Sequence, residues 1–229
     1  MNYIIFEDHL FANLQPFTIN HASFELRSGA LTNIERIQIL TNENDKIYLI
    51  VRDILCELTR ERFPEFIVNP DIIPNGIHLN GATLWDTKTI GKIQTGRHYS
   101  HQGNLIAMHC EKEIKLSEYA DYIKKSIQVT LDIPAIHFSY LWECIFALEN
   151  ILTYDIEHFL HCKGGEAHQS VIYDGIKNVF IHENSKICAG VILDASNGPI
   201  IIDDNVKIDI GALIQGPVYI GKNSVINPG

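Results

Sequence analysis

Arg27 is the residue of this chain best placed for phosphate chemistry. It precedes Gly29 and stands shortly before Thr32 and Glu35, whose spacing is that of a capping box at the start of a helix. A helix N-terminus attracts anions, and an arginine donates paired hydrogen bonds to phosphate oxygens. We therefore expect Arg27 to contact a phosphate as a catalytic cation. The alternative is a structural ion pair of Arg27 with Glu25 or Glu35.

His182 is the candidate for acid–base chemistry. It follows the apolar Ile181 inside a repeat, so its side chain is expected to point outward. Histidine is the side chain that most often acts as a general base near neutral pH. The alternative is a solvent-exposed histidine without a role.

A second group of ligand-type residues lies further along the chain. Its first two histidines have the spacing of one helical face, and the full set is His158, His161, Cys162 and His168. These side chains have the types that bind zinc. The alternative is a polar linker in which histidines happen to cluster.

Composition narrows the classes of function. The 229 residues contain 18 Lys+Arg against 28 Asp+Glu, a formal charge of −10, so the basic surface of a nucleic-acid or anionic-membrane binder is missing. The N-terminus lacks the pattern of a secretory signal, and the apolar stretch 140–152 is interrupted by Glu143 and Glu149 and is too short to span a bilayer. Five scattered cysteines are typical of reduced thiols. We expect a cytoplasmic protein.

The first 160 or so residues alternate between strand and helix patterns. A strand is expected over 3–6, a helix over 31–40, a buried strand over 47–51 and a helix over 53–63 that ends before Pro64. Alternation of this kind predicts an α/β sheet that is at least partly parallel. The further expected elements are strands over 66–68 and 77–79, a hairpin of 98–99 with 105–108, and helices over 117–126 and 140–152.

The last fifty residues contain a repeat of six. Six of the seven intervals between successive large aliphatic residues are six residues long, the marks being Ile181, Ile187, Leu193, Ile202, Ile208, Ile214, Ile220 and Ile226. Most marks are followed four positions later by a small or β-branched residue. This period predicts short strands and tight turns stacked as a parallel β-helix, with the marks pointing inward. The alternative is a series of β-hairpins, which would not hold one fixed period.

The expected organisation follows from these two patterns. An α/β domain covers 1–162, a linker 163–170, and the β-helix 171–229. Under three coils of about 18 residues separate Ile181 from Ile226, and no capping segment follows. We expect the β-helix either to be truncated after Gly229 or to be covered by another subunit.

Short matches over nearly the whole chain carry a resemblance to a known family. The matching segments are Leu14-x-Pro16-Phe17-Thr18, Glu25-x-Arg27-x-Gly29-x-Leu31-Thr32-x-x-Glu35-Arg36, Ile77-x-Leu79-Asn80-Gly81, Gly103-Asn104-Leu105-Ile106-Ala107, Leu141-Trp142-Glu143 and the repeats that end in 216–226. With them the chain resembles bacterial proteins similar to the bifunctional N-acetylglucosamine-1-phosphate uridyltransferase and glucosamine-1-phosphate N-acetyltransferase.

The resemblance implies a nucleotidyltransferase-like mixed or parallel sheet with flanking helices, followed by a short left-handed β-helix of the acyltransferase type. It implies nucleotidyl transfer from a nucleoside triphosphate to a sugar 1-phosphate with Mg²⁺, and assembly as a homotrimer through the β-helix. The family's acetyl-CoA residues lie on later coils, so we expect acetyl-CoA to be used only by a longer chain, and no acetyltransferase activity here.

For the activity that the resemblance implies, the residues of this chain offer a set of site candidates. Arg27 and His182 are the catalytic candidates, and Asp155 is the candidate metal ligand. The substrate-binding candidates are Gly29, Asn80, Gly81 and Arg97.

The segment after the first strand departs from a typical phosphate loop. Glu7 and Asp8 stand where related transferases have glycines, and a triphosphate arriving there would meet like charge. Two hypotheses therefore stay open. One is an active sugar-nucleotide transferase, and the other is a catalytically degenerate relative that binds nucleotide sugars or serves as an oligomerisation scaffold.

Overall fold

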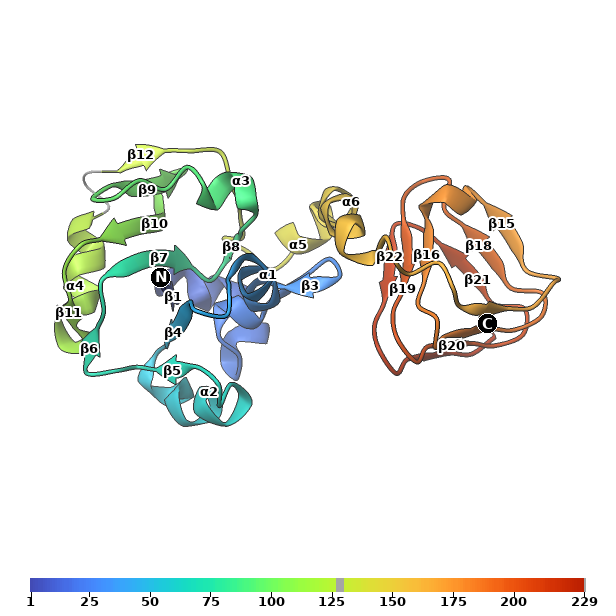
Figure 1. Ribbon diagram of the computed structural model, residues 1–229, viewed down its shortest axis with the longest axis horizontal. Helices are drawn as coiled ribbons and strands as arrows, with labels where there is room; N and C mark the ends of the chain where they lie inside the picture. Colours follow the sequence, from blue (N-terminus) through green and yellow to red (C-terminus); the bar gives the residue numbers. More distant parts are fainter. Residues whose placement is uncertain (127–129, 229) are drawn as a thin grey trace. The chain divides into compact units, whose positions relative to one another are not determined.

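The computed structural model describes residues 1–126 and 130–228 (Figure 1). Contacts divide the chain into two compact units. Unit 1 comprises Met1–Arg27 and Thr32–Glu143, and unit 2 comprises Ser28–Leu31 and Cys144–Gly229, of which Gly229 lies outside the described residues. No helix in the described part of the chain is long and apolar enough to cross a membrane.

Unit 1 is a mixed α/β unit with a parallel-rich central sheet. The strand order is β12-β9-β10-β7-β1-β4-β5. The strands are β1 (Asn2–Phe6), β4 (Lys46–Ile50), β5 (Ile67–Val68), β7 (Gly76–Asn80), β9 (His98–His101), β10 (Asn104–Cys110) and β12 (Leu131–Asp132). β1 pairs in parallel with both β4 and β7, whereas β10 runs antiparallel to β7 and to β9. The predicted α/β sheet and the predicted hairpin are confirmed.

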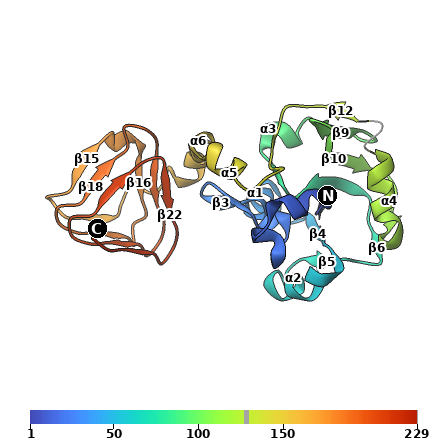
Figure 2. The ribbon, with the colours of Figure 1, turned by 180° about the vertical axis from the view of Figure 1, so that it is seen from behind.

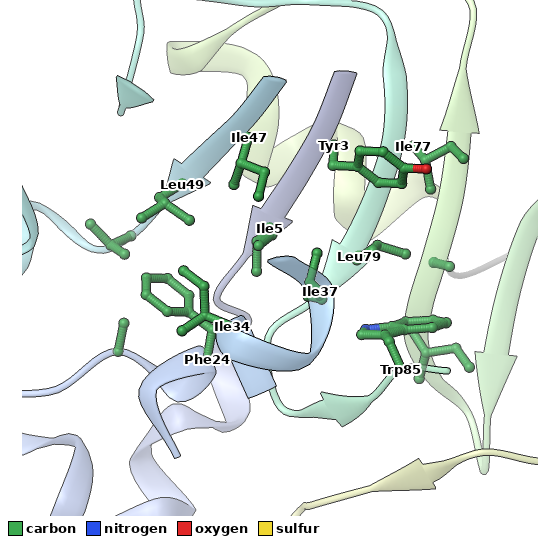
Figure 3. Close-up of a cluster of buried hydrophobic side chains, with 14 of the residues drawn as sticks. Tyr3, Ile5, Phe24, Ile34, Ile37, Ile47, Leu49, Ile77, Leu79 and Trp85 are labelled. Carbon is green, nitrogen blue, oxygen red and sulfur yellow. The ribbon is translucent and has the colours of Figure 1, made fainter. Parts of the chain in front are cut away.

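Helices cover both faces of this sheet, which explains why the central strands β1 and β4 are mostly apolar. Helix α1 (Asn33–Leu40) packs Ile34 and Ile37 with Ile5 of β1 in one buried cluster (Figure 3). Helix α4 (Leu116–Ser126) contributes Tyr119 to a second cluster with Ile4 and Phe6. Since Ile4 and Ile5 belong to different clusters, β1 is buried on both sides.

The first turn of α1 has the hydrogen bonds that the sequence predicts. The Thr32 hydroxyl accepts from the Glu35 amide at 3.2 Å, and the Glu35 carboxylate accepts from the Thr32 amide at 2.7 Å. This is the capping box that the sequence predicts, and it fixes the first turn of the helix.

Shorter elements complete unit 1. In place of one helix over 53–63, a 3-10 turn η4 (Asp53–Leu55) precedes α2 (Cys56–Arg62). The others are η1 (His9–Leu14), η2 (Phe17–Ile19), η3 (Ser23–Glu25), β2 (Arg27–Ser28), β3 (Leu31–Thr32), β6 (Ile72–Ile73), β8 (Thr83–Leu84), α3 (Thr87–Ile90), β11 (Ile114–Lys115) and β13 (Ile136–His137). β2 and β3 form a two-stranded hairpin, and its segment Ser28–Leu31 belongs to unit 2.

In unit 2 the chain visits three parallel sheets in rotation. The first holds β14 (Glu166–Ala167), β17 (Lys186–Ile187), β20 (Lys207–Ile208) and β23 (Val225–Ile226). The second holds β15 (Ile172–Asp174), β18 (Ile192–Asp194) and β21 (Leu213–Gln215), and the third holds β16 (Val179–Ile181), β19 (Ile200–Ile202) and β22 (Val218–Ile220). β15 and β18 lie side by side in both views (Figure 1, Figure 2). This arrangement is compatible with the predicted parallel β-helix.

The interior of unit 2 confirms the side-chain directions predicted from the six-residue period. Ile187, Leu193, Ile202 and Ile208 are buried in one cluster, and Ile214 and Ile226 of the later marks are partly buried against it. In the strand register, Lys207 of β20 lies beside Val225 of β23, 18 residues later in the sequence. Lys186 of β17 lies beside Lys207, 21 residues later. The turn that begins at Ser196 accounts for the longer coil, because it is inserted between β18 and β19.

Helix α6 (Leu148–Phe159) belongs to unit 2. The single helix expected over 140–152 is wrong: α5 (Glu143–Phe146) and α6 are separate, and α6 extends to Phe159. Leu152 and Phe159 pack with Phe180 and Ile201, which point out of β16 and β19. Outward apolar residues on these strands explain why the helix packs there.

Candidate functional site

The carboxyl ends of β1, β4 and β7 form the candidate site of unit 1. β1 lies between β4 and β7, and the chain reaches β4 on one side before it reaches β7 on the other. The sheet therefore has a topological switch point beside β1, where open α/β sheets bind their ligands. The residues that follow these strand ends are Glu7 and Asp8, Val51 and Arg52, and Gly81.

A hollow of about 340 Å³ opens at the ends of β1 and β4. One wall is polar and carries Glu7, Asp8, Arg52 and Asp53. The other wall is formed by α4 through Leu116, Tyr119, Ala120 and Ile123. Its volume is at the lower end of the range for small-molecule sites, and the pairing of an apolar wall with a few polar groups is typical of them.

Arg52 and Glu7 form a buried ion pair in this hollow. Arg52 Nη1 lies 2.6 Å from Glu7 Oε1, and the two side chains are 18% and 2% exposed. Arg52 also donates to the carbonyl oxygens of Thr18 and His21, and its guanidinium lies 4.3 Å from the centre of the Phe11 ring. The guanidinium is thus held on several sides.

Burial raises the pKa of Glu7, and the bond to Arg52 acts against this shift. Glu7 Oε1 also accepts from the Ser23 amide at 3.1 Å. The other carboxylate oxygen, Oε2, is buried and has no hydrogen-bond partner within the described chain.

Asn80 and Gly81 lie at the carboxyl end of β7, beside the switch point. Asn80 Nδ2 donates to Asp8 Oδ2 at 2.7 Å and to the Leu105 carbonyl at 3.0 Å. A Cβ on Gly81 would lie 2.9 Å from Phe24 Cβ, so this position needs a glycine for packing. Both residues therefore also have a role within the fold itself.

A histidine lies close to this group. His137 Nδ1 lies 2.9 Å from Thr83 Oγ1. Burial lowers the pKa of His137, while the charges of Asp8 and Glu143 act in the opposite direction. Asp8 thus interacts electrostatically with His137 and by hydrogen bonding with Asn80.

The described lining residues of the hollow do not include the other predicted residues, Arg27, Gly29 and Arg97. Arg27 Nη2 lies 3.4 Å from Glu35 Oε2, the ion pair that the sequence leaves as the alternative. Gly29 belongs to the turn that packs in unit 2. Arg97 precedes β9, and its carbonyl accepts from His109, which pairs with Ile77 near the start of β7. Arg97 is thus at the opposite end of β7 from Asn80.

The metal candidates are not assembled into a site. Asp155 is buried on α6, and its Oδ2 accepts from the Ala30 amide at 2.8 Å. Among residues 1–126 and 130–228, no group of three His, Cys, Asp or Glu side chains could hold a metal ion. This contradicts the zinc reading of His158, His161, Cys162 and His168, because Cys162 is buried in the α6 cluster and His168 Nδ1 lies 2.8 Å from Ser170 Oγ.

His182 in unit 2 pairs with a carboxylate. Its Nδ1 lies 3.2 Å from Asp204 Oδ1, and its side chain is 23% exposed. Asn184 Nδ2 donates to the same Asp204 oxygen at 2.9 Å. The outward direction predicted from Ile181 agrees with this partial exposure.

Arg52 is the candidate that sequence reasoning missed. The signal was present, since Arg52 directly follows the apolar run 47–51 and therefore stands at the carboxyl end of a buried strand. What was missing was the neighbour relation, because only strand pairing places the end of β4 beside the end of β1.

Comparison with known protein families gives one match, whereas no curated protein matches the chain. The sequence pattern of the sugar nucleotidyl transferase family matches residues 3–162, which is well over half of the chain. The strand-end hollow, the parallel-rich sheet and this match lead to one conclusion: the chain belongs to the sugar nucleotidyl transferase family.

Proposed function

We propose that unit 1 binds a sugar nucleotide, or the sugar 1-phosphate and nucleoside triphosphate from which one is made, at the carboxyl ends of β1, β4 and β7. The observation that carries this proposal is the polar hollow beside the switch point of a domain in this family. Within the family, we place the chain with the bacterial relatives of the bifunctional uridyltransferase and acetyltransferase, because its α/β unit precedes a six-residue repeat.

Asp8 is the proposed contact to ligand hydroxyl groups, and Asn80, which is fully buried and donates to Asp8 Oδ2, is the proposed residue that positions it. Arg27 remains the proposed phosphate contact and would have to leave Glu35 to act as one. Gly29, Gly81 and Arg97 remain proposed substrate residues.

Mg²⁺ is the metal that this family implies. Asp155 does not fit it, since this carboxylate is buried in unit 2 and bonded to a backbone amide. In phosphoryl-transfer sites Mg²⁺ is held by substrate phosphates with one or two carboxylates. Asp53, an exposed residue at the hollow, fits that requirement: it would hold the ion together with phosphates that lie outside the hollow, and the ion would neutralise phosphate charge.

A second candidate function is binding without turnover. It is favoured by the carboxylates after β1 and by the pairing of Arg52 with Glu7, which leave little positive charge for a departing pyrophosphate. The two candidates share the ligand and differ in the chemistry.

The discriminating experiment joins a binding panel to an activity assay. Nucleoside triphosphates, sugar 1-phosphates and nucleotide sugars are screened by thermal shift, where a ligand at a hundredfold excess over Kd adds about 2.7 kcal/mol to stability. Pyrophosphate release is then followed for the ligands that bind. Binding without pyrophosphate release supports the second candidate. If no compound of the panel stabilises the protein, both candidates are contradicted. Turnover that Arg27→Ala leaves unchanged contradicts the role of Arg27, with Glu35→Gln as the matched control.

We further propose that unit 2 is a left-handed β-helix of the acyltransferase type, through which three copies assemble. Support comes from its outer faces. α6 covers the sheet of β16, and Lys186 and Lys207 cover the sheet of β17. The remaining sheet exposes an aligned row of Ile172, Ile192 and Leu213, with exposed fractions of 58%, 36% and 68%. An aliphatic row of this kind is typical of an interface.

His182 is the proposed general base of unit 2, with Asp204 holding its ring. Our expectation for this chain is nevertheless no acetyltransferase activity. Consumption of acetyl-CoA with glucosamine 1-phosphate, abolished by His182→Ala, would overturn that expectation.

A further inference from the structure

The hollow at the ends of β1 and β4 has an unusual charge balance for a family that handles phosphates. Three carboxylates line it, from Glu7, Asp8 and Asp53, whereas Arg52 is the one arginine or lysine among its described lining residues. A free phosphate group entering this hollow would meet net negative charge.

The arginine is also engaged. Glu7 holds Arg52 at 2.6 Å, and the carbonyl oxygens of Thr18 and His21 accept from the same guanidinium. A phosphate that displaced Glu7 from Arg52 would leave a buried carboxylate without its cation. If Glu7 stayed in place, the two anions would lie against each other in a poorly solvated site.

Glu7 nevertheless has acceptor capacity to spare. Its Oε1 is used by Arg52 and by the Ser23 amide, but its buried Oε2 accepts no hydrogen bond from the described residues. Asp8 and Asp53 on the same wall are likewise acceptors when ionised. Such a wall suits a neutral group that brings hydrogen-bond donors and packs its apolar side against the α4 wall.

We propose that Glu7 is a specificity-determining residue that closes this hollow to free phosphate groups by holding Arg52. The hollow then takes the uncharged, hydroxyl-bearing part of a ligand, a nucleoside or a sugar ring, and the phosphates lie outside it. This inference rests on the proposed function, because it assigns the parts of the same ligand.

The test measures pyrophosphate binding by calorimetry, in EDTA so that no divalent cation masks the charge. Wild-type protein is expected not to bind. Glu7→Gln keeps the shape of the side chain and removes its charge, so it is expected to bind pyrophosphate with a Kd at least about tenfold below the highest concentration at which the wild type shows no binding. The double variant with Glu7→Gln and Arg52→Gln is expected to lose this gain in pyrophosphate binding.

Asp53→Asn is the matched control. It removes one negative charge from the same hollow and leaves the Arg52–Glu7 pair intact. An equal gain in Asp53→Asn would overturn the proposal, since general charge would then explain it. No gain in a folded Glu7→Gln would also overturn it. If Glu7→Gln does not fold, the wild type and Arg52→Gln are compared instead. Saturable pyrophosphate binding by the wild type that is lost in Arg52→Gln would then contradict the proposal.

The outcomes separate this inference from the proposed function. If the wild type binds no sugar nucleotide but Glu7→Gln gains pyrophosphate binding, only the proposed function is contradicted. If the wild type binds a sugar nucleotide but Glu7→Gln gains no pyrophosphate binding, only the role of Glu7 is contradicted.

Discussion

His78 lies in the middle of β7, where the fold disfavours its charged form. The residue is fully buried, its Nδ1 lies 2.9 Å from the Tyr119 hydroxyl, and its Nε2 has no hydrogen-bond partner among the described residues. Burial lowers the pKa of His78 to about 3, and the charges of His109 and His98 act in the same direction. The unfolded chain therefore binds a proton at this residue at a higher pH than the native protein does.

This residue predicts an acid-sensitive fold. Above about pH 6.5 His78 is neutral in both the native and the unfolded state. As the pH is lowered from there towards 3, only the unfolded chain takes up the proton, so the free energy of unfolding falls by up to about 1.4 kcal/mol per pH unit. Urea unfolding of wild type and His78→Gln at pH 7, 6 and 5 measures the slope. The difference in stability between the two proteins is expected to shrink as pH falls, and a constant difference would contradict the prediction.

At the scale of elements, α6 shows how packing sets the limits of a helix. The apolar pattern alone favoured a helix over 140–152, but Leu152, Asp155 and Phe159 anchor α6 further along the chain. Asp155 accepts from the Ala30 amide, which belongs to a turn 125 residues away in sequence. A carboxylate that the sequence nominated for a metal thus stabilises a contact between helix and turn.

Asp155→Ala is expected to destabilise the protein by about 1–3 kcal/mol, because it leaves the buried Ala30 amide without this acceptor. Asp155→Asn keeps an acceptor oxygen and is expected to recover most of the loss. Chemical denaturation measures both, with the exposed Glu157→Ala on the same helix as the control. Equal losses in the Ala and Asn variants would point to a need for charge, as in metal binding.

At the scale of the whole molecule, the uncovered aliphatic row of unit 2 predicts self-association. Leu213→Glu places a charge at the most exposed position of the row, so this variant is expected to be monomeric where the wild type forms the proposed trimer. Light scattering coupled to gel filtration gives the mass directly. Lys207→Glu changes a charged face and is expected to leave the mass unaltered. A monomeric wild type would contradict the proposed trimer.

The sequence alone determined the features that depend on local spacing. The capping box of Thr32 and Glu35 and the inward residues of the six-residue repeat follow from neighbours a few positions apart, so they could be predicted. The short family matches over the α/β part agree with the family match over residues 3–162.

Only the tertiary structure decided which charged groups meet. Arg52 follows β4 and Glu7 follows β1, 45 residues apart in sequence, and strand pairing places them 2.6 Å from each other. Arg27 pairs with Glu35 instead of lining the hollow, and Asp155 bonds to Ala30. The reason is physical: periodicity reports which face of an element is buried, whereas the partner of a charge depends on which elements pack together.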